Sequence, residues 1–161
     1  MTSSTEPRWL SDTEQRAWRD YLWARRELDV ALERDLQPHE ISLAEYELIS
    51  MLSEAPEGCL RMSALADLII QSRSRVTHTA SRLESRGWVR RRRADQDGRG
   101  VVLCLTPQGR IVLEAVAKVH VESVRRHFID LMTPEQLQGL GAAMCSVRQA
   151  YAAEGDSGAK P

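Results

Sequence analysis

The sequence predicts a mainly α-helical protein that contains one small β-hairpin. Apolar residues recur at helical spacing along most of the 161 residues, whereas two short segments with strand propensity, residues 89–93 and 101–105, flank a polar loop with two glycines. Hydrophobic residues make up 42% of the chain and charged residues 28%, a composition typical of a globular protein with a core. We therefore expect one folded chain without internal repeats.

Several classes of protein are disfavoured by what the sequence lacks. No apolar run approaches the roughly 18 residues of a membrane-spanning helix, and the polar N-terminus has no signal-peptide core, so we expect a cytoplasmic protein that does not use a membrane. The three cysteines, Cys59, Cys104 and Cys145, are an odd number and widely spaced, which argues against a disulfide framework. Because no phosphate-binding glycine loop, metal-binding His-Glu pair or nucleophile elbow occurs, we expect neither an enzyme nor a cofactor.

The first predicted helix covers residues 11–37. Ser11 is a suitable N-cap, Glu14 can complete a capping box, and Pro38 ends the helix. A second helix is predicted over residues 43–54, before a turn that contains proline and glycine.

Two further helices follow in close succession, at residues 64–69 and 72–86, and they are separated by a turn at Ile70 and Gln71. The predicted hairpin comes directly after them. Two helices joined by a short turn and followed by a hairpin form the pattern of a winged helix-turn-helix, which we assign to residues 43–105.

Two long helices complete the chain, at residues 106–132 and 133–152, and each is opened by a Thr-Pro pair. In the last helix the apolar residues are spaced alternately three and four apart, which is a short heptad seam. The winged lobe cannot cover this seam, so packing against a second copy is the simplest solution. We assign residues 11–37 and 106–152 to dimerisation and residues 153–161 to a flexible tail. The predicted dimer interface consists of Leu137, Leu140, Met144, Val147 and Tyr151.

Positive charge is concentrated in the middle of the chain. Residues 72–100 contain nine arginines and three acidic residues, a net charge of +6, and because the whole chain carries −1 the remainder carries −7. A cationic segment between acidic flanks is typical of a surface that binds a polyanion such as nucleic acid. On charge alone, an arginine-rich solvated face is the simpler alternative.

The predicted helix at residues 72–86 has a polar face that suits the major groove of DNA. Val76, Ala80 and Leu83 share the face that would pack on the domain, whereas hydroxyls, an imidazole and guanidiniums cover the other. The residues that we expect to contact DNA from this helix are Ser72, Arg73, Ser74, Arg75, Thr77, His78, Ser81 and Arg82.

The hairpin provides a second candidate contact with DNA. Residues 90–93 are four consecutive arginines, and Arg99 stands between two glycines at the tip, from where it could enter a narrow minor groove. Asp97 can pair with Arg99 and fix its direction. The residues that we expect to contact DNA from the hairpin are Arg91, Arg93, Asp97 and Arg99.

The chain resembles the MarR family of bacterial transcription regulators over nearly its whole length. The segments that carry the resemblance are Leu65-Ala66, Ser72-Arg73-Ser74-x-Val76-Thr77, Leu83-Glu84-x-x-Gly87-x-Val89, Asp97-x-Arg99-Gly100 and Leu105-Thr106-x-x-Gly109. The resemblance implies a homodimer that binds a pseudo-palindromic operator in double-stranded DNA and represses transcription. It also implies release by a small lipophilic or phenolic effector that binds between the dimer helices and the DNA-binding lobe. One departure is the turn at Ile70 and Gln71, where many relatives have a glycine.

The nature of the signal that such a regulator would sense stays open at this point. Trp18, Trp23 and Tyr46 could line an effector pocket, although aromatic residues at helical spacing are more often core. A redox-responsive regulator would need an activated thiol, for which Cys59 is the candidate.

A metal sensor and a protein-binding module are also compatible with the predicted fold. A metal-responsive regulator would need ligands gathered from His120, His127, His39 and Glu40, which the sequence does not bring together. A winged helix that binds only another protein would have no use for four consecutive arginines.

Overall fold

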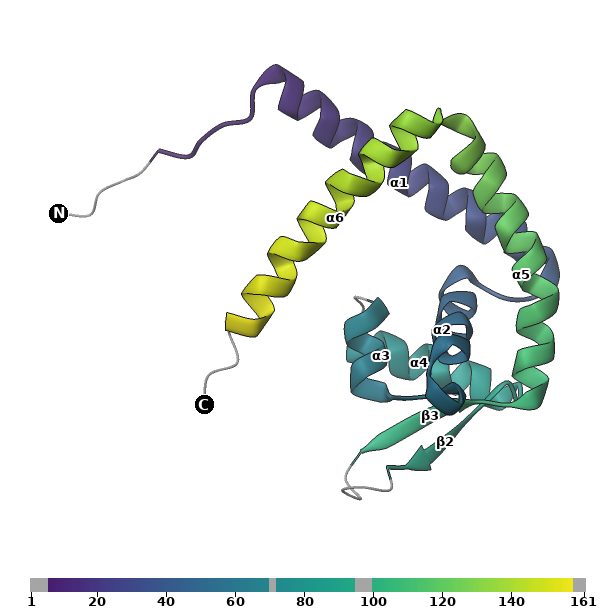
Figure 1. Cartoon of the computed structure of the whole chain (residues 1–161). Helices are drawn as coiled ribbons and strands as arrows, with labels where there is room; N and C mark the ends of the chain where they lie inside the picture. Colours follow the sequence, from purple (N-terminus) through teal and green to yellow (C-terminus); the bar gives the residue numbers. More distant parts are fainter. Residues whose placement is uncertain (1–5, 70–71, 95–99, 158–161) are drawn as a thin grey trace.

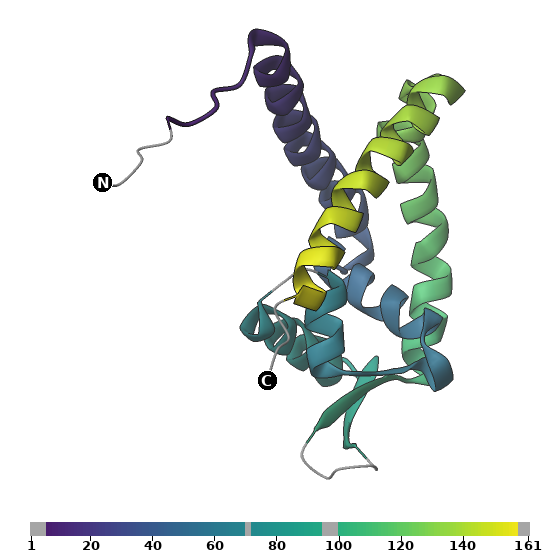
Figure 2. The same ribbon diagram turned by 60° about the vertical axis from the view of Figure 1, so that its left-hand side comes forward.

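The computed structural model describes residues 6–69, 72–94 and 100–157, and it is mainly α-helical, as the sequence predicts (Figure 1). A small sheet and the helices α2, α3 and α4 form a lobe at one end (Figures 1 and 2). The long helix α5 runs from the sheet to the other end of the molecule, and α6 leads back from there toward the lobe. The elements in chain order are α1 (Asp12–Leu36), α2 (Leu43–Glu54), β1 (Cys59–Arg61), α3 (Met62–Ile69), α4 (Arg73–Ser85), β2 (Val89–Arg93), β3 (Val101–Leu105), α5 (Pro107–His127) and α6 (Pro134–Ser157), with 3-10 turns at Gln37–His39, Pro56–Gly58 and Ile129–Leu131.

The first two helices begin at capping boxes. The backbone N–H of Ser11 donates to Oε2 of Glu14 over 2.8 Å, as predicted. Ser42 and Glu45 repeat the arrangement at the start of α2. Each box satisfies backbone groups that have no partner within the helix, so it defines where the helix begins.

The sheet has three strands rather than the two that we predict from the sequence. All pairs are antiparallel, in the order β1-β3-β2. Sequence patterns miss β1 because it contains only three residues, too few to show a period of two.

The sequence argues against a disulfide framework, but the structure contains a disulfide. Cys59 of β1 and Cys104 of β3 are register partners, their Cα atoms lie 4.1 Å apart, and a disulfide joins them. Their separation of 45 residues conceals this contact, which exists only because β1 pairs with β3. Cys145 in α6 is free and exposed.

The core of the lobe lies where α4 meets α2 and the sheet. Val76, Ala80 and Leu83 of α4 are buried against it, as their spacing predicts. Further core side chains come from all the surrounding elements, including Leu36, Leu48, Ile49, Leu52, Leu65, Leu103 and Val116. The assignment of residues 43–105 to a separate lobe and of the other helices to dimerisation stays a prediction.

The last two helices differ from the predicted bounds. The α5 helix ends at His127 instead of residue 132, because the chain turns at Phe128 into the 3-10 turn Ile129–Leu131. The α6 helix runs to Ser157, so it extends into residues 153–161, which we expected to form a flexible tail. No described helix combines the length and the apolar character needed to cross a membrane.

The junction between the hairpin and α5 is close-packed, and it explains the Leu-Thr-x-x-Gly segment. The Thr106 hydroxyl accepts from the backbone N–H of Gly109 and lies 2.7 Å from the Gly87 carbonyl oxygen, to which it can donate. A Cβ atom on Gly109 would lie 2.1 Å from the Trp88 carbonyl oxygen, so only glycine fits at this position. The first turn of α5 is thereby held directly on the backbone of the hairpin.

Gly109→Ala should lower the free energy of unfolding by about 1–3 kcal/mol, because the added methyl forces the backbones of α5 and Trp88 apart. The matched control is Gly139→Ala in α6, where an added Cβ meets no described atom within 4 Å. The control should be neutral or stabilising by up to about 1 kcal/mol. Urea denaturation of the two variants measures both effects, and equal stability of Gly109→Ala and the wild type would contradict the close contact.

Candidate nucleic-acid interface

One face of α4 is a continuous polar surface. Ser72 caps the helix by accepting from the Arg75 N–H over 3.3 Å. The side chains that point away from the core are exposed, and they include Ser74, Arg75, Thr77, His78 and Ser81. All of these were predicted from the helical spacing. The side chain of Arg73 lies outside the described part of the chain.

Arg82 also lies on α4, but its guanidinium is held by α2. Its Nη2 atom lies 2.8 Å from Oε1 of Glu45, and its Nε donates to the same oxygen over 3.1 Å. Arg86, one turn further on, packs its guanidinium 3.8 Å from the ring centroid of Trp88. These contacts anchor α4 to α2 and to the hairpin.

Glu45 is the centre of this anchor, and only 3% of its surface is exposed. Burial raises the pKa of its carboxyl group, but hydrogen bonds from Ser42 and Arg82 outweigh that effect and hold the pKa below the ordinary value. The carboxylate is therefore charged at neutral pH and neutralises part of the positive charge of α4.

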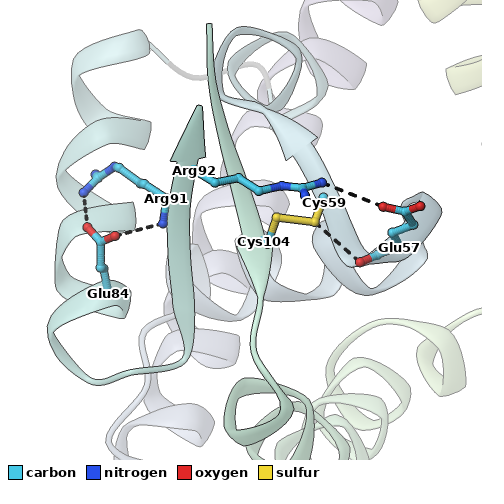
Figure 3. Close-up of a disulfide and its surroundings, with 6 residues drawn as sticks. All are labelled: Glu57, Cys59, Glu84, Arg91, Arg92 and Cys104. Atoms are coloured by element: carbon cyan, nitrogen blue, oxygen red, sulfur yellow. Dashed lines mark hydrogen bonds and ion pairs between the residues drawn. A yellow bond between two sulfur atoms is a disulfide. The ribbon is translucent and has the colours of Figure 1, made fainter. Parts of the chain in front are cut away.

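A second carboxylate holds the wing, which is the hairpin of β2 and β3, against α4. Glu84 accepts from the Arg91 backbone N–H over 2.9 Å and forms an ion pair with the Arg91 guanidinium. Nη2 of Arg91 also donates to the Thr77 carbonyl oxygen and to Oγ of Ser81, over 3.1 and 2.9 Å. Figure 3 shows Arg91 reaching from β2 to Glu84 on α4. The wing strand is thereby braced on the helix that we expect to meet DNA.

The remaining predicted wing residues lie partly within and partly outside the described chain. Arg93 is exposed on β2. Asp97 and Arg99 lie outside the described residues, as do Ile70 and Gln71 of the predicted turn. Arg92 leaves β2 on the face opposite to Arg91, and its Nη2 lies 3.7 Å from Oε2 of Glu57 (Figure 3).

Our sequence analysis assigns no role at the site to Glu45 or to Glu84. Glu84 is the single acidic residue of the predicted helix 72–86, and this isolation among arginines is a signal that could have found it. Glu45 could only have been recognised as the Glu of a capping box, because its contact with Arg82 spans 37 positions of sequence.

The side chains that we expect at a dimer interface are partly or fully exposed in the single chain. Leu137 and Leu140 are half-buried, whereas Met144, Val147 and Tyr151 are exposed, with 70% exposure for Tyr151. An apolar groove of about 820 Å³ lies beside this seam, between α1, the end of α5 and the start of α6. Its apolar lining includes Tyr21, Leu28, Phe128, Leu131, Leu140 and Met144.

The three aromatic residues proposed for an effector pocket do not line this groove. Trp18 and Trp23 are exposed on α1, where Trp18 stacks on Tyr21 with ring centroids 5.7 Å apart. Tyr46 is buried in α2, and its ring lies 4.2 Å from that of His120 on α5.

The chain is similar in sequence and structure to known transcriptional regulators. A model of the MarR family matches residues 39–100, which include α2, β1, α3, α4 and β2. Among curated proteins, the regulator PecS of Dickeya dadantii (strain 3937) is 28% identical over 109 residues, which are 66% of this chain and 63% of that one. The chain therefore spans slightly less than two thirds of PecS.

Two solved structures are more similar. AbsC, a MarR family transcriptional regulator from Streptomyces coelicolor, is 43% identical with a TM-score of 0.85, and the match covers 91% of this chain and 99% of that one. Sco3205, a MarR family transcriptional regulator from the same organism, was solved in complex with DNA. It is 41% identical with a TM-score of 0.85, and the match covers 91% of this chain and 92% of that one.

Glu45→Gln should destabilise the fold by about 1–3 kcal/mol at pH 7, because it leaves the donors of Ser42 and Arg82 without their charged acceptor. The pKa of Glu45 is lowered in the folded state, so its stabilisation is present above the unfolded pKa and is lost as the pH falls through the folded pKa. The variant and the wild type should therefore converge in stability as the pH falls below about 4.5, the ordinary pKa of Glu. Denaturant titrations at a series of pH values measure this.

The exposed Glu114 of α5 provides the control, and Glu114→Gln should change the stability by less than about 0.5 kcal/mol at each pH. A stability difference for Glu45→Gln that does not shrink in acid would contradict the assigned role of the carboxylate.

Proposed function

The chain belongs to the MarR family of transcriptional regulators, and on this premise we propose that it is a dimeric, sequence-specific DNA-binding repressor that a small molecule releases from its operator. The family is one of DNA-binding regulators rather than enzymes. We further propose a pseudo-palindromic operator, because a two-fold symmetric dimer presents the same helix to each half-site.

The observation that carries this proposal is the polar outer face of α4 above a fully buried inner face. Ser74, Arg75 and His78 are exposed on this face, and a helix with such a face fits the major groove. Arg75 supplies a guanidinium that can bind guanine, whereas Thr77 offers a methyl and a hydroxyl group. The DNA complex of the similar Sco3205 supports the same conclusion.

The arginines of the proposed interface divide into two roles. Arg82 and Arg91 are engaged by Glu45 and Glu84, so we assign them to the positioning of α4 and the wing. Arg93 and Arg99 would contact DNA themselves, with Asp97 directing Arg99, as the sequence predicts.

We propose that a second copy of this chain covers the seam of α6 and the adjacent apolar groove. The groove is continuous with the seam, since Leu140 and Met144 belong to both. Exposed Trp18 and Trp23 on the neighbouring α1 add to the apolar surface that is uncovered in one copy. Burial of such surface is the dominant favourable term in association.

The effector would bind where α2 meets α5. Nδ1 of His120 is buried, and it has no hydrogen-bond partner among the described residues. Such a nitrogen is costly unless a ligand or water meets it. Burial lowers the pKa of His120 and raises the pKa of Tyr46, so both rings are neutral at pH 7 and suit an uncharged phenolic ligand. Within the described chain, no group of three or more His, Cys, Asp or Glu residues could hold a metal.

Fluorescence anisotropy with a duplex from upstream of the protein's own gene, against a scrambled duplex, tests the proposal. We expect preferential binding of the upstream duplex that weakens steeply with salt, because neutralised phosphates release counterions. Arg75→Ala or Arg99→Ala should weaken binding by roughly 1–3 kcal/mol. Arg125→Ala, which removes an exposed arginine at the far end of α5, is the matched control and should bind like the wild type.

Equal affinity for both duplexes would contradict sequence-specific binding to that site. Failure to bind either duplex at low salt would favour a protein-interaction module instead. A reporter gene behind the bound sequence would then separate repression, which we expect, from activation.

Leu140→Glu should convert the dimer into a monomer, because it places a charge in the seam beside the groove. Size-exclusion chromatography with light scattering measures the mass directly. Gln138→Glu, which adds the same charge at an exposed position of α6, should leave the dimer intact. A Leu140→Glu protein that still elutes as a dimer would locate the interface elsewhere.

A further inference from the structure

The disulfide between Cys59 and Cys104 lies on the side of the sheet that faces away from α4. Figure 3 shows it behind the side chain of Arg92, whereas Arg91 and Glu84 lie on the opposite side of β2. Cys104 is 2% exposed, whereas Cys59 is half-buried, so Cys59 is the more accessible residue of the pair. Neither the proposed DNA binding nor the proposed dimer requires a disulfide between Cys59 and Cys104.

Two arginine side chains lie near the start of β1, where Cys59 is placed. The Arg92 guanidinium passes the disulfide on its way to Glu57, and an Arg110 guanidinium nitrogen lies 3.6 Å from the position of a Cβ on Gly58. In thiol–disulfide exchange the thiolate is the reactive form of cysteine. Sγ of Cys59 also lies 3.5 Å from the Glu57 carbonyl oxygen, which can accept from the thiol in the reduced state.

We propose that Cys59 and Cys104 form a reversible oxidation site, and that the oxidant is a low-molecular-weight disulfide. The Cys59 thiolate attacks one sulfur of the small disulfide, which forms a mixed disulfide and releases one small thiolate. The Cys104 thiolate then attacks Sγ of Cys59, which forms the protein disulfide and releases the second small thiolate. Two protein thiols are thus oxidised, and one small disulfide is reduced to two thiols.

The position of the bond connects its redox state to the surface that we propose for DNA. Cys59 and Cys104 are 45 residues apart, and the loop that they close contains α3, α4 and β2. The β1 strand leads directly into α3, and β3 carries the paired wing strand β2. The disulfide therefore holds the start of the helix-turn-helix to the wing.

Reduction should loosen this arrangement without unfolding it. The backbone pairing of β1 with β3 and the Glu84–Arg91 contact do not involve sulfur, so both persist in the dithiol. The oxidised form should bind DNA more tightly, because a restrained helix and wing lose less conformational freedom on binding. This step rests on the proposed function, whereas the oxidation site itself does not.

The test begins with the thiols of the intact protein. The full chain is equilibrated in mixtures of reduced and oxidised glutathione, quenched with acid, alkylated and analysed by mass spectrometry. In the wild type and in the control Cys145→Ser, Cys59 and Cys104 should change together from two alkylated thiols to a linked peptide pair as the oxidised fraction rises. A disulfide that persists in reduced glutathione alone, or a dithiol that persists in oxidised glutathione alone, would overturn the proposal.

The second measurement is the anisotropy titration on both forms of the protein. Reduction should weaken binding of the upstream duplex at least about five-fold in the wild type and in Cys145→Ser. It should have no effect in Cys59→Ser or Cys104→Ser. Equal affinity of the reduced and oxidised wild type would overturn the coupling between the disulfide and DNA. Absence of binding in both forms would overturn the proposed function, and the thiol measurement alone would then decide the oxidation site.

Discussion

The arrangement of this molecule depends on one close backbone contact, in which the first turn of α5 rests on the carbonyl group of Trp88. The contact leaves no room for a side chain at position 109, and the Thr106 hydroxyl closes it with hydrogen bonds to both sides. Because α5 also packs along α1 and leads to α6, this junction sets the direction of every long helix relative to the lobe. In the proposed dimer, a rigid junction would help to hold the two copies of α4 at the spacing of two half-sites.

Two carboxylates form ion pairs with arginines of the lobe. Glu45 and Glu84 each hold an arginine, so part of the net +6 of residues 72–100 is used to hold α4 against α2 and the wing against α4. Arg82 and Arg91 therefore position α4 and the wing relative to the rest of the lobe. Arg75 and Arg93 are exposed, whereas Arg82 and Arg91 are held by carboxylates, so under the proposed function a count of arginines overstates the number of direct contacts with DNA.

The two faces of the small sheet have different chemistry. Arg91 and Glu84 brace the wing on the face toward α4, and the disulfide ties β1 to β3 on the other face. Ion pairing and covalent bonding thus restrain the same wing independently. Of these two restraints, only the disulfide responds to electron transfer, and this is why a redox signal could adjust the wing while the fold persists.

The sequence by itself determined the features that depend on neighbours a few positions apart. The capping box of Ser11, the buried stripe of Val76, Ala80 and Leu83, and the exposed face of α4 all follow from interactions within one or two turns of helix. The resemblance to a known family likewise depended on short local segments.

Only the tertiary structure decided the contacts between distant segments. β1 is too short to have a pattern of its own and exists because β3 is beside it, and its pairing brings together two cysteines 45 positions apart. The partner of Arg82 was likewise hidden, since Glu45 belongs to another helix and lies 37 positions away. Such contacts form when the whole chain closes around its core, so no local pattern records them.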